Sequence, residues 1–171
     1  MLLLCIACSF ANMLTISISA VQAAQWNPQP LINAENLLIE TPGLWELQNT
    51  NPSSQQYYDP ANDLTVILSV IFKKDMAISS LDQLPKNSLA LLTESSRNVQ
   101  TISQKSGKEL GHPMLVTEFT AESNQMNLHY IFKHIDLGDR WVEFQIFGFP
   151  SQIENATEKI DRFLNSIHSP S

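Results

Sequence analysis

The sequence predicts an α+β domain, and three patterns of apolar residues carry that prediction. Leu64–Phe72 (LTVILSVIF) is an apolar, β-branched run between turn residues and two lysines, as expected of a central strand covered on both faces. Met126–Phe132 alternates apolar and polar residues, which is the period of a strand. Ile153–Ile167 carries one apolar stripe at helical spacing. The domain therefore combines a sheet with at least one amphipathic helix.

Shorter elements fill the first half of the chain. Leu37–Glu40 and Gln55–Tyr58 are strand candidates, because each ends at a Pro-containing turn. The leucine spacing after Ser79 predicts a helix from Pro85 to about Arg97. That helix begins at Pro85 because proline cannot donate an interior helical hydrogen bond.

The second half predicts a meander of strands followed by the terminal helix. Turns are expected at Ser106-Gly107 and at Gly111–Pro113, and Trp141–Phe149 is expected to be the last strand. Ser151 and Glu154 fit a capping box that starts the C-terminal helix, which should lie across the sheet and close the core.

The N-terminus predicts export. The first 24 residues contain no Lys, Arg, Asp or Glu, and Val21 and Ala23 fit the small-residue positions before a signal-peptidase cut. We therefore assign residues 1–23 as a signal peptide, residues 24–36 as a polar extended arm and residues 37–168 as a single domain. No basic residue precedes the apolar run, so two alternatives stay open: an uncleaved membrane anchor, or lipid attachment at Cys8.

Composition restricts the chemistry of the mature protein. The net charge is −7, so binding to the nucleic-acid backbone is not expected. Both cysteines, Cys5 and Cys8, precede the predicted cut, which leaves a mature chain without thiols or disulfides. Membrane association is expected only if the N-terminal segment is uncleaved. No cofactor is predicted, and the oligomeric state is not indicated.

The order of these elements resembles the PsbP/Mog1-like superfamily, including exported bacterial domains of the DcrB type. The resemblance rests on Pro42-Gly43-Leu44-Trp45, on Glu109–Pro113 leading into Leu115–Phe119, and on the ending Phe163–Ile167. It implies an antiparallel β-sheet flanked by helices on both faces, in an α/β/α sandwich. It also implies a binding or assembly role without catalysis, although no functional residue carries over because the matching motifs are structural.

Five residues are candidates for a site. His134 and Asp136 share a face of one predicted strand, and they are a weak metal or acid/base pair. Trp26 in the arm, with Tyr57 and Tyr58, could contact a partner or ligand. We expect Trp45 and Trp141 to pack in the core.

The sequence contains no G-x-S-x-G, H-E-x-x-H, phosphate-loop or EF-hand pattern. It therefore favours a non-enzymatic, exported interaction or assembly domain of a bacterial envelope, most simply periplasmic, with an envelope protein as partner. The alternative is a periplasmic small-ligand or lipid carrier with a pocket beneath a helix. A third hypothesis is an enzyme of unrecognised type that uses His134, Asp136 or Glu143.

Overall fold

The computed structural model describes residues 25–34 and 36–170, so the predicted signal peptide and both cysteines lie outside the described residues. Two 3-10 turns, η1 (Lys73–Asp75) and η2 (Leu81–Gln83), connect the fifth strand to the first long helix. The other elements, in chain order, are β1 (Trp26–Pro30), β2 (Leu38–Pro42), β3 (Glu46–Asn51), β4 (Ser54–Asp59), β5 (Leu64–Phe72), α2 (Leu84–Ser95), β6 (Arg97–Glu109), β7 (His112–Ser123), β8 (Met126–Asp136), β9 (Arg140–Gly148), α3 (Pro150–Asn155) and α4 (Thr157–Leu164).

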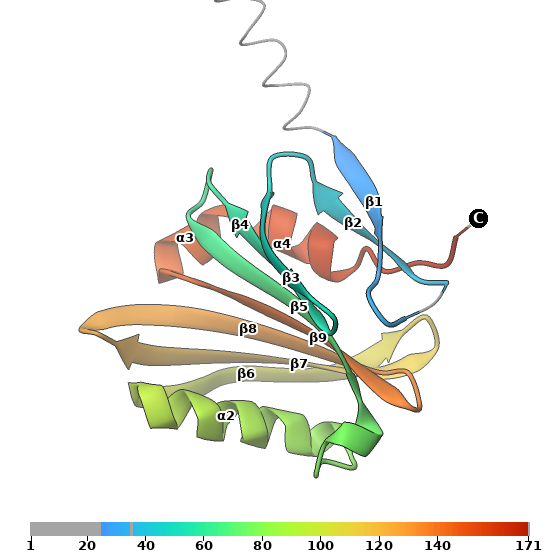
Figure 1. Cartoon of the computed structure of the whole chain (residues 1–171). Coiled ribbons are helices and arrows are strands. Elements are labelled where there is room, and N and C mark those ends of the chain that lie inside the picture. The colour runs from blue at the N-terminus through green and yellow to red at the C-terminus, as the bar shows by residue number, and fades with distance from the viewer. Residues whose placement is uncertain (1–24, 35, 171) are drawn as a thin grey trace, which may run out of the picture.

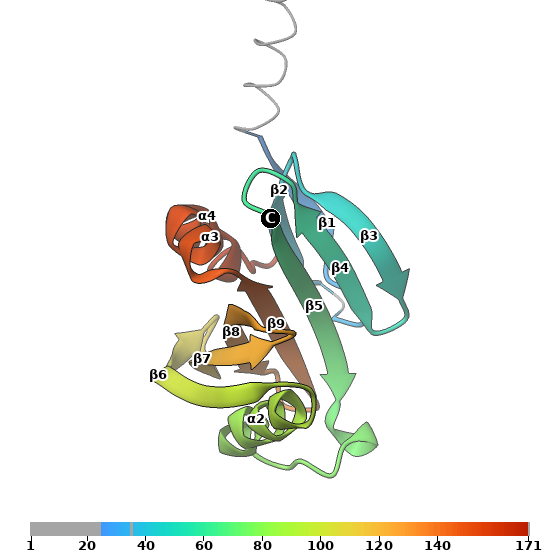
Figure 2. The same ribbon diagram turned by 90° about the vertical axis from the view of Figure 1, so that its left-hand side faces the viewer.

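Seven of the strands form one antiparallel sheet in the order β3-β4-β5-β9-β8-β7-β6. β5 and β9 are adjacent although α2 and three strands separate them in the chain, so the apolar run Leu64–Phe72 is indeed internal to the sheet. The ribbon twists strongly between the β3 and β6 edges (Figure 2). The predicted α+β class and antiparallel sheet are confirmed.

One side of the sheet packs against α3, α4 and the β1–β2 hairpin, and we call it the α4 side (Figure 1). Phe163 of α4 is fully buried there, with its ring 4.8 Å from Trp45 and 5.4 Å from Phe144. Val66 of β5 and Ile131 of β8 belong to the same cluster. This side holds the main hydrophobic core.

The opposite side carries α2, and we call it the α2 side. Phe132 follows Ile131 in β8 and therefore points to the other face of the sheet, toward Leu84 and Leu92 of α2. Its ring lies 5.6 Å from that of Phe119 on β7. Trp141 is fully buried on this side, with the Lys73 ammonium 3.9 Å from its ring centroid.

The prediction that residues 24–36 form an extended arm is wrong. Within the described residues, Trp26–Pro30 is strand β1, paired antiparallel with β2 in a separate two-stranded sheet. Leu31 and Ala34 are buried in the main core, because the hairpin folds over it rather than extending into solvent. The predicted domain start at residue 37 therefore divides a hairpin.

Three details of the second half also differ from expectation. Ser106-Gly107 is not a turn, because β6 continues through it to Glu109. Gly107 lies opposite Met114, and a Cβ there would be 2.9 Å from Met114 Cε, the flexible end of that side chain. The C-terminal helix is divided at Ala156, and Gln152, not Glu154, accepts a hydrogen bond at its start, from the Phe149 N–H (2.7 Å). Within the described part of the chain, no helix meets the length and hydropathy needed to cross a bilayer.

Candidate functional site

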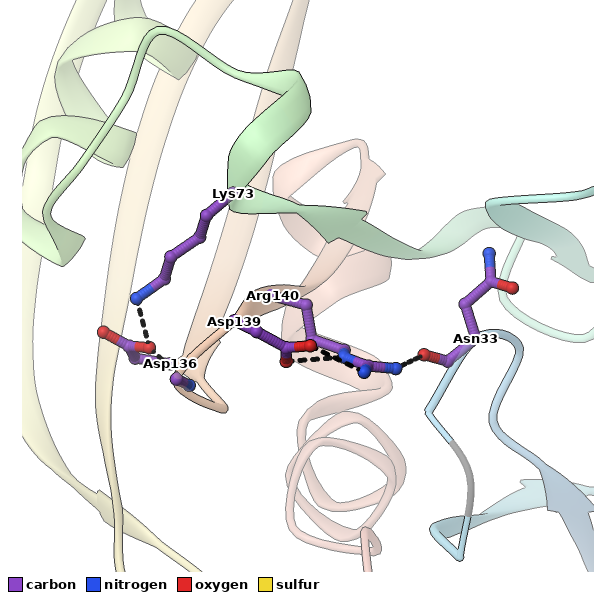
Figure 3. Close-up of polar contacts among 6 residues, drawn as sticks. Asn33, Lys73, Asp136, Asp139 and Arg140 are labelled. Atoms are coloured by element: carbon purple, nitrogen blue, oxygen red, sulfur yellow. Dashed lines mark hydrogen bonds and ion pairs between the residues drawn. The ribbon is translucent and has the colours of Figure 1, made fainter.

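His134 and Asp136 share the α2 side of β8, but they do not bind each other. His134 Nε2 lies 2.8 Å from Glu143 Oε2, because the two residues are direct partners across β8 and β9. Asp136 instead accepts a hydrogen bond from Lys73 Nζ at 2.6 Å (Figure 3). The predicted His134–Asp136 pair is therefore wrong, since each side chain binds a residue of another element, Glu143 of β9 and Lys73 of η1.

Three linked polar side chains, His134, Glu143 and Gln145, form a row on the α2 side of the sheet, which we call the polar row. His134 is fully buried, and its ring stacks 6.1 Å from that of Phe132. Its Nε2–H donates to Glu143, while Nδ1 has no hydrogen-bond partner among the described residues. The second Glu143 oxygen, Oε1, accepts a hydrogen bond from Gln145 Nε2 at 2.5 Å. The carboxylate is thus held in one orientation from both sides.

Glu143 and Gln145 form the floor of a groove between α2 and the sheet. The groove has a volume of about 400 Å³. Its walls are mainly apolar, and the residues that line it are Ile71, Met76, Leu84, Asn87, Ser88, Leu91, Leu92, Ser95, Phe132, Glu143 and Gln145. Of these described lining residues, only Glu143 is ionisable.

A second hollow, of about 380 Å³, lies on the α4 side between α3, α4 and β6–β8. Its polar wall is already paired: Glu118 accepts from Ser103 Oγ at 2.8 Å and lies 3.0 Å from His129 Nε2. Lys105 and Asp161 also line it, so the charges there are mixed in sign. This balance favours no single ligand class.

The sequence analysis missed one buried charge. Lys133 is only 1% exposed on the α4 side, where its Nζ donates to Glu109 Oε2 (3.1 Å), Asn165 Oδ1 (3.3 Å) and the Leu164 carbonyl. Burial lowers the pKa of Lys133, while Glu109 opposes that shift. Strand alternation places Lys133 on one face, but only the position of α4 shows that this face is covered there.

The three aromatic candidates are placed within the domain. Tyr57 is buried in the main core beside Trp45, and burial raises the pKa of its hydroxyl. Trp26 packs at the edge of the same core, with the Arg162 guanidinium 4.1 Å from its ring. Tyr58 is half-buried and donates to Asp63 Oδ1 at 2.8 Å. Of the three, Tyr58 is the one that lines a surface hollow, beside Glu46 and Gln48 of β3.

Arg140 joins the N-terminal segment to the sheet. It is bonded to Asp139 through Nε at 2.8 Å and donates to the carbonyl oxygen of Asn33, in the connection between β1 and β2 (Figure 3). Within the described residues, no group of three or more His, Cys, Asp or Glu side chains is arranged to hold a metal ion.

The architecture described above, a seven-stranded antiparallel sheet with α2 and α3–α4, is the PsbP/Mog1-like fold. No protein-family profile matches the sequence, and no curated protein matches it. Similar solved structures include the Ran-binding protein Mog1p of Saccharomyces cerevisiae, with a TM-score of 0.61, 10% identity, and coverage of 85% of this chain and 96% of that one.

Two further structures have the same fold. Cyanobacterial PsbP (CyanoP) of Synechocystis has a TM-score of 0.62 at 11% identity, over 85% of this chain and 92% of that one. LpqN of Mycobacterium tuberculosis, which is involved in cell envelope biogenesis, has a TM-score of 0.53 at 11% identity, over 90% of this chain and 96% of that one. The resemblance inferred from the sequence is therefore confirmed for the fold.

Proposed function

We propose that this protein is a non-enzymatic, exported interaction domain of the DcrB type that binds a protein partner in a bacterial envelope. The N-terminal signal pattern supports export, and the fold supports a binding role because Mog1p binds Ran and LpqN is involved in envelope biogenesis. The observation that carries the proposal is the β3 edge of the sheet.

β3 is an edge strand whose six residues are all exposed. An exposed edge offers unpaired backbone groups to an added strand, which is a common way to bind an extended peptide. Leu47 on this edge is 55% exposed, and Tyr58 on the neighbouring strand lines the adjacent hollow. An extended partner segment with an apolar side chain fits this edge.

The opposite edge, β6, is less suited to strand addition. Two register shifts interrupt its pairing with β7, and it carries Lys105 and Lys108, while β3 has a single shift. Bulges and lysines are features that discourage edge pairing. Ile102 on β6 is 53% exposed, so it provides a matched control for Leu47.

A photo-cross-linking amino acid at Leu47 tests the proposal. Placed there in the full chain and expressed in the host, it should capture the same envelope protein repeatedly, whereas the same probe at Ile102 should not. Equal capture from both edges, or none from Leu47, contradicts the β3 edge as the binding site. N-terminal sequencing of the exported protein tests the localisation, with Ala24 or Gln25 expected as the first residue.

The polar row supports the non-enzymatic assignment. The His134 ring has no exposed surface and already donates to Glu143, so it cannot reach a substrate proton directly. Asp136 is partly exposed, but it already accepts a hydrogen bond from Lys73 at 2.6 Å. If the wild-type protein turned over any substrate, and a folded His134→Gln variant did not, this assignment would be contradicted.

Small-ligand binding is a second candidate function. One observation favours it: the groove beneath α2 has a volume of about 400 Å³, which lies within the range of ligand pockets. In that case the protein would be a periplasmic carrier, and the groove rather than the β3 edge would be its working surface.

A further inference from the structure

We propose that the groove between α2 and the sheet binds a single-chain amphiphile whose polar head is a primary ammonium or a similar hydrogen-bond donor. The inference develops the ligand-binding alternative and does not depend on a protein partner at the β3 edge. It rests on the shape of the groove, on its apolar walls and on the single carboxylate at its floor.

The walls suit a hydrocarbon chain. Leu84 is buried where α2 begins, Leu92 is half-buried further along the helix, and Phe132 closes the floor from β8. The groove is elongated, because the residues that line it run from Leu84 at the start of α2 to Ser95 at its end. A groove that follows a helix for its whole length accommodates an extended chain better than a compact ring.

Leu91 provides a second argument for an apolar occupant. It lines the groove, yet the residue is 58% exposed. Burying apolar surface is favourable in rough proportion to the area removed from water. A hydrocarbon chain bound in the groove would cover Leu91, so binding would remove apolar surface from water.

The floor determines the preferred head group. Glu143 is the only ionisable residue among the described lining residues. His134 holds Oε2 and Gln145 holds Oε1, and each carboxylate oxygen can still accept a further hydrogen bond. An ammonium head can therefore donate to the carboxylate without reorienting it, whereas a carboxylate head would meet like charge.

The neighbouring cation does not reverse this preference. Lys73 lies on the same side of the sheet, but its ammonium is bound to Asp136 and faces the Trp141 ring. Neither Lys73 nor Asp136 lines the groove, and their charges offset each other. The local charge presented to a ligand is thus that of Glu143.

Decylammonium and decanoate are matched probes, with the same chain length and opposite head charges. Binding is measured by isothermal titration of the purified protein, below the concentrations at which the probes form micelles. We expect decylammonium to bind at least about tenfold more tightly than decanoate, the size of effect expected for one hydrogen bond to a charged group. Equal affinity, tighter decanoate binding, or no binding of either probe overturns the proposal.

Two variants separate the chain from the head. Glu143→Gln keeps an oxygen that can accept from His134, and it should remove most of the preference for decylammonium. Leu91→Gln should weaken both probes several-fold while leaving their ratio unchanged. Leu47→Gln is the matched control, because Leu47 is similarly exposed (55%) but lies on β3, and it should change neither affinity.

These outcomes are independent of the partner proposal. If the probes bind as expected and cross-linking at Leu47 captures nothing, the groove stands and the β3 edge fails. If Leu91→Gln and Leu47→Gln affect the probes equally, binding is not in the groove and the inference is wrong.

Discussion

The two sides of the sheet are filled with different kinds of side chain. On the α4 side most buried residues are apolar, and the two buried charges there are paired: Lys133 has three hydrogen-bond acceptors, and Asp59 accepts a hydrogen bond from Lys159. On the α2 side, polar His134 and Thr117 are fully buried among aromatic rings, each with an atom that lacks a partner among the described residues. Such unpaired groups reduce stability.

This difference suggests a division of roles. A large apolar core contributes most of the folding free energy, and the α4 side has that form, although Trp45 Nε1 within it has no hydrogen-bond partner among the described residues. A groove with a carboxylate held in one orientation contributes less to stability and is better suited to binding.

Removing the hairpin segment should have the largest effect. A chain that begins at Leu37 lacks β1 together with the buried residues Leu31 and Ala34. We expect it to lose at least about 3 kcal/mol of unfolding free energy relative to a chain that begins at Gln25, because at least one large core side chain is lost. Urea unfolding monitored by tryptophan fluorescence measures this, and equal midpoints would restore the view of this segment as an external arm.

Paired core truncations compare the two sides directly. Phe163→Ala on the α4 side should lower the unfolding free energy by about 3–5 kcal/mol, because its buried ring contacts two other aromatic rings. Leu84→Ala should lower it by about 2 kcal/mol, since Leu84 borders a groove that is already open. Leu91→Ala, at an exposed position, should change it by less than about 0.5 kcal/mol. A larger loss for Leu84→Ala than for Phe163→Ala would contradict the division.

Lys133→Met tests the buried charge on the α4 side. The variant leaves Glu109 and the Leu164 carbonyl without their donor, so it should lose about 1–3 kcal/mol near neutral pH. Burial lowers the folded-state pKa of Lys133, so the unfolded chain binds more protons between the folded and unfolded pKa values. Wild-type stability therefore gains a rising contribution as the pH increases through that alkaline window.

The variant lacks this contribution, and the stability difference from wild type should grow with pH. Denaturant titrations at several alkaline pH values measure it, and the tyrosines cancel because both proteins contain them. A difference that shrinks as the pH rises would mean that the folded protein holds the Lys133 proton more tightly than the unfolded chain.

Thr117→Val on the α2 side should give the only gain in stability. Thr117 is fully buried and its hydroxyl has no partner among the described residues, so removing the hydroxyl should raise stability by about 1 kcal/mol. Thr41→Val is the matched control on the α4 side. Its hydroxyl donates to the Asn27 carbonyl at 3.4 Å, so that variant should lose about 0.5 kcal/mol. Losses of equal size in both variants would indicate that the Thr117 hydroxyl is satisfied.

Local pattern was enough to predict the interior of the sheet. Leu64–Phe72 is apolar enough to predict a central strand, and the structure places it as β5 between β4 and β9; Trp141–Phe149 predicts a strand, but only the pairing places β9 inside the sheet. The first strand could not be predicted in this way, because Pro28 and Pro30 favour an extended arm and only pairing with β2 makes the segment a strand. Gly107 was misleading for a similar reason, since only the pairing with β7 shows that β6 continues through it.

The candidate site depended even more on tertiary contacts. The sequence placed His134 and Asp136 on one face, which is correct, but each partner comes from another strand or turn. Glu143 and Glu118 lie on opposite faces of the sheet, because their partners on β8, His134 and Ile131, are separated by an odd number of positions. Strand register, which single residues do not specify, decides these pairings.

The most direct test of the division between the two sides is an amide NMR titration of the protein with decylammonium. We predict chemical-shift changes confined to α2 and to the parts of β8 and β9 near Phe132, Glu143 and Gln145, with the amides of α3 and α4 unaffected. Chemical-shift changes centred on α3 and α4 would contradict the account, because they would place the ligand at the main core. Changes spread evenly over the sheet would also contradict it, because they would indicate binding at no specific site.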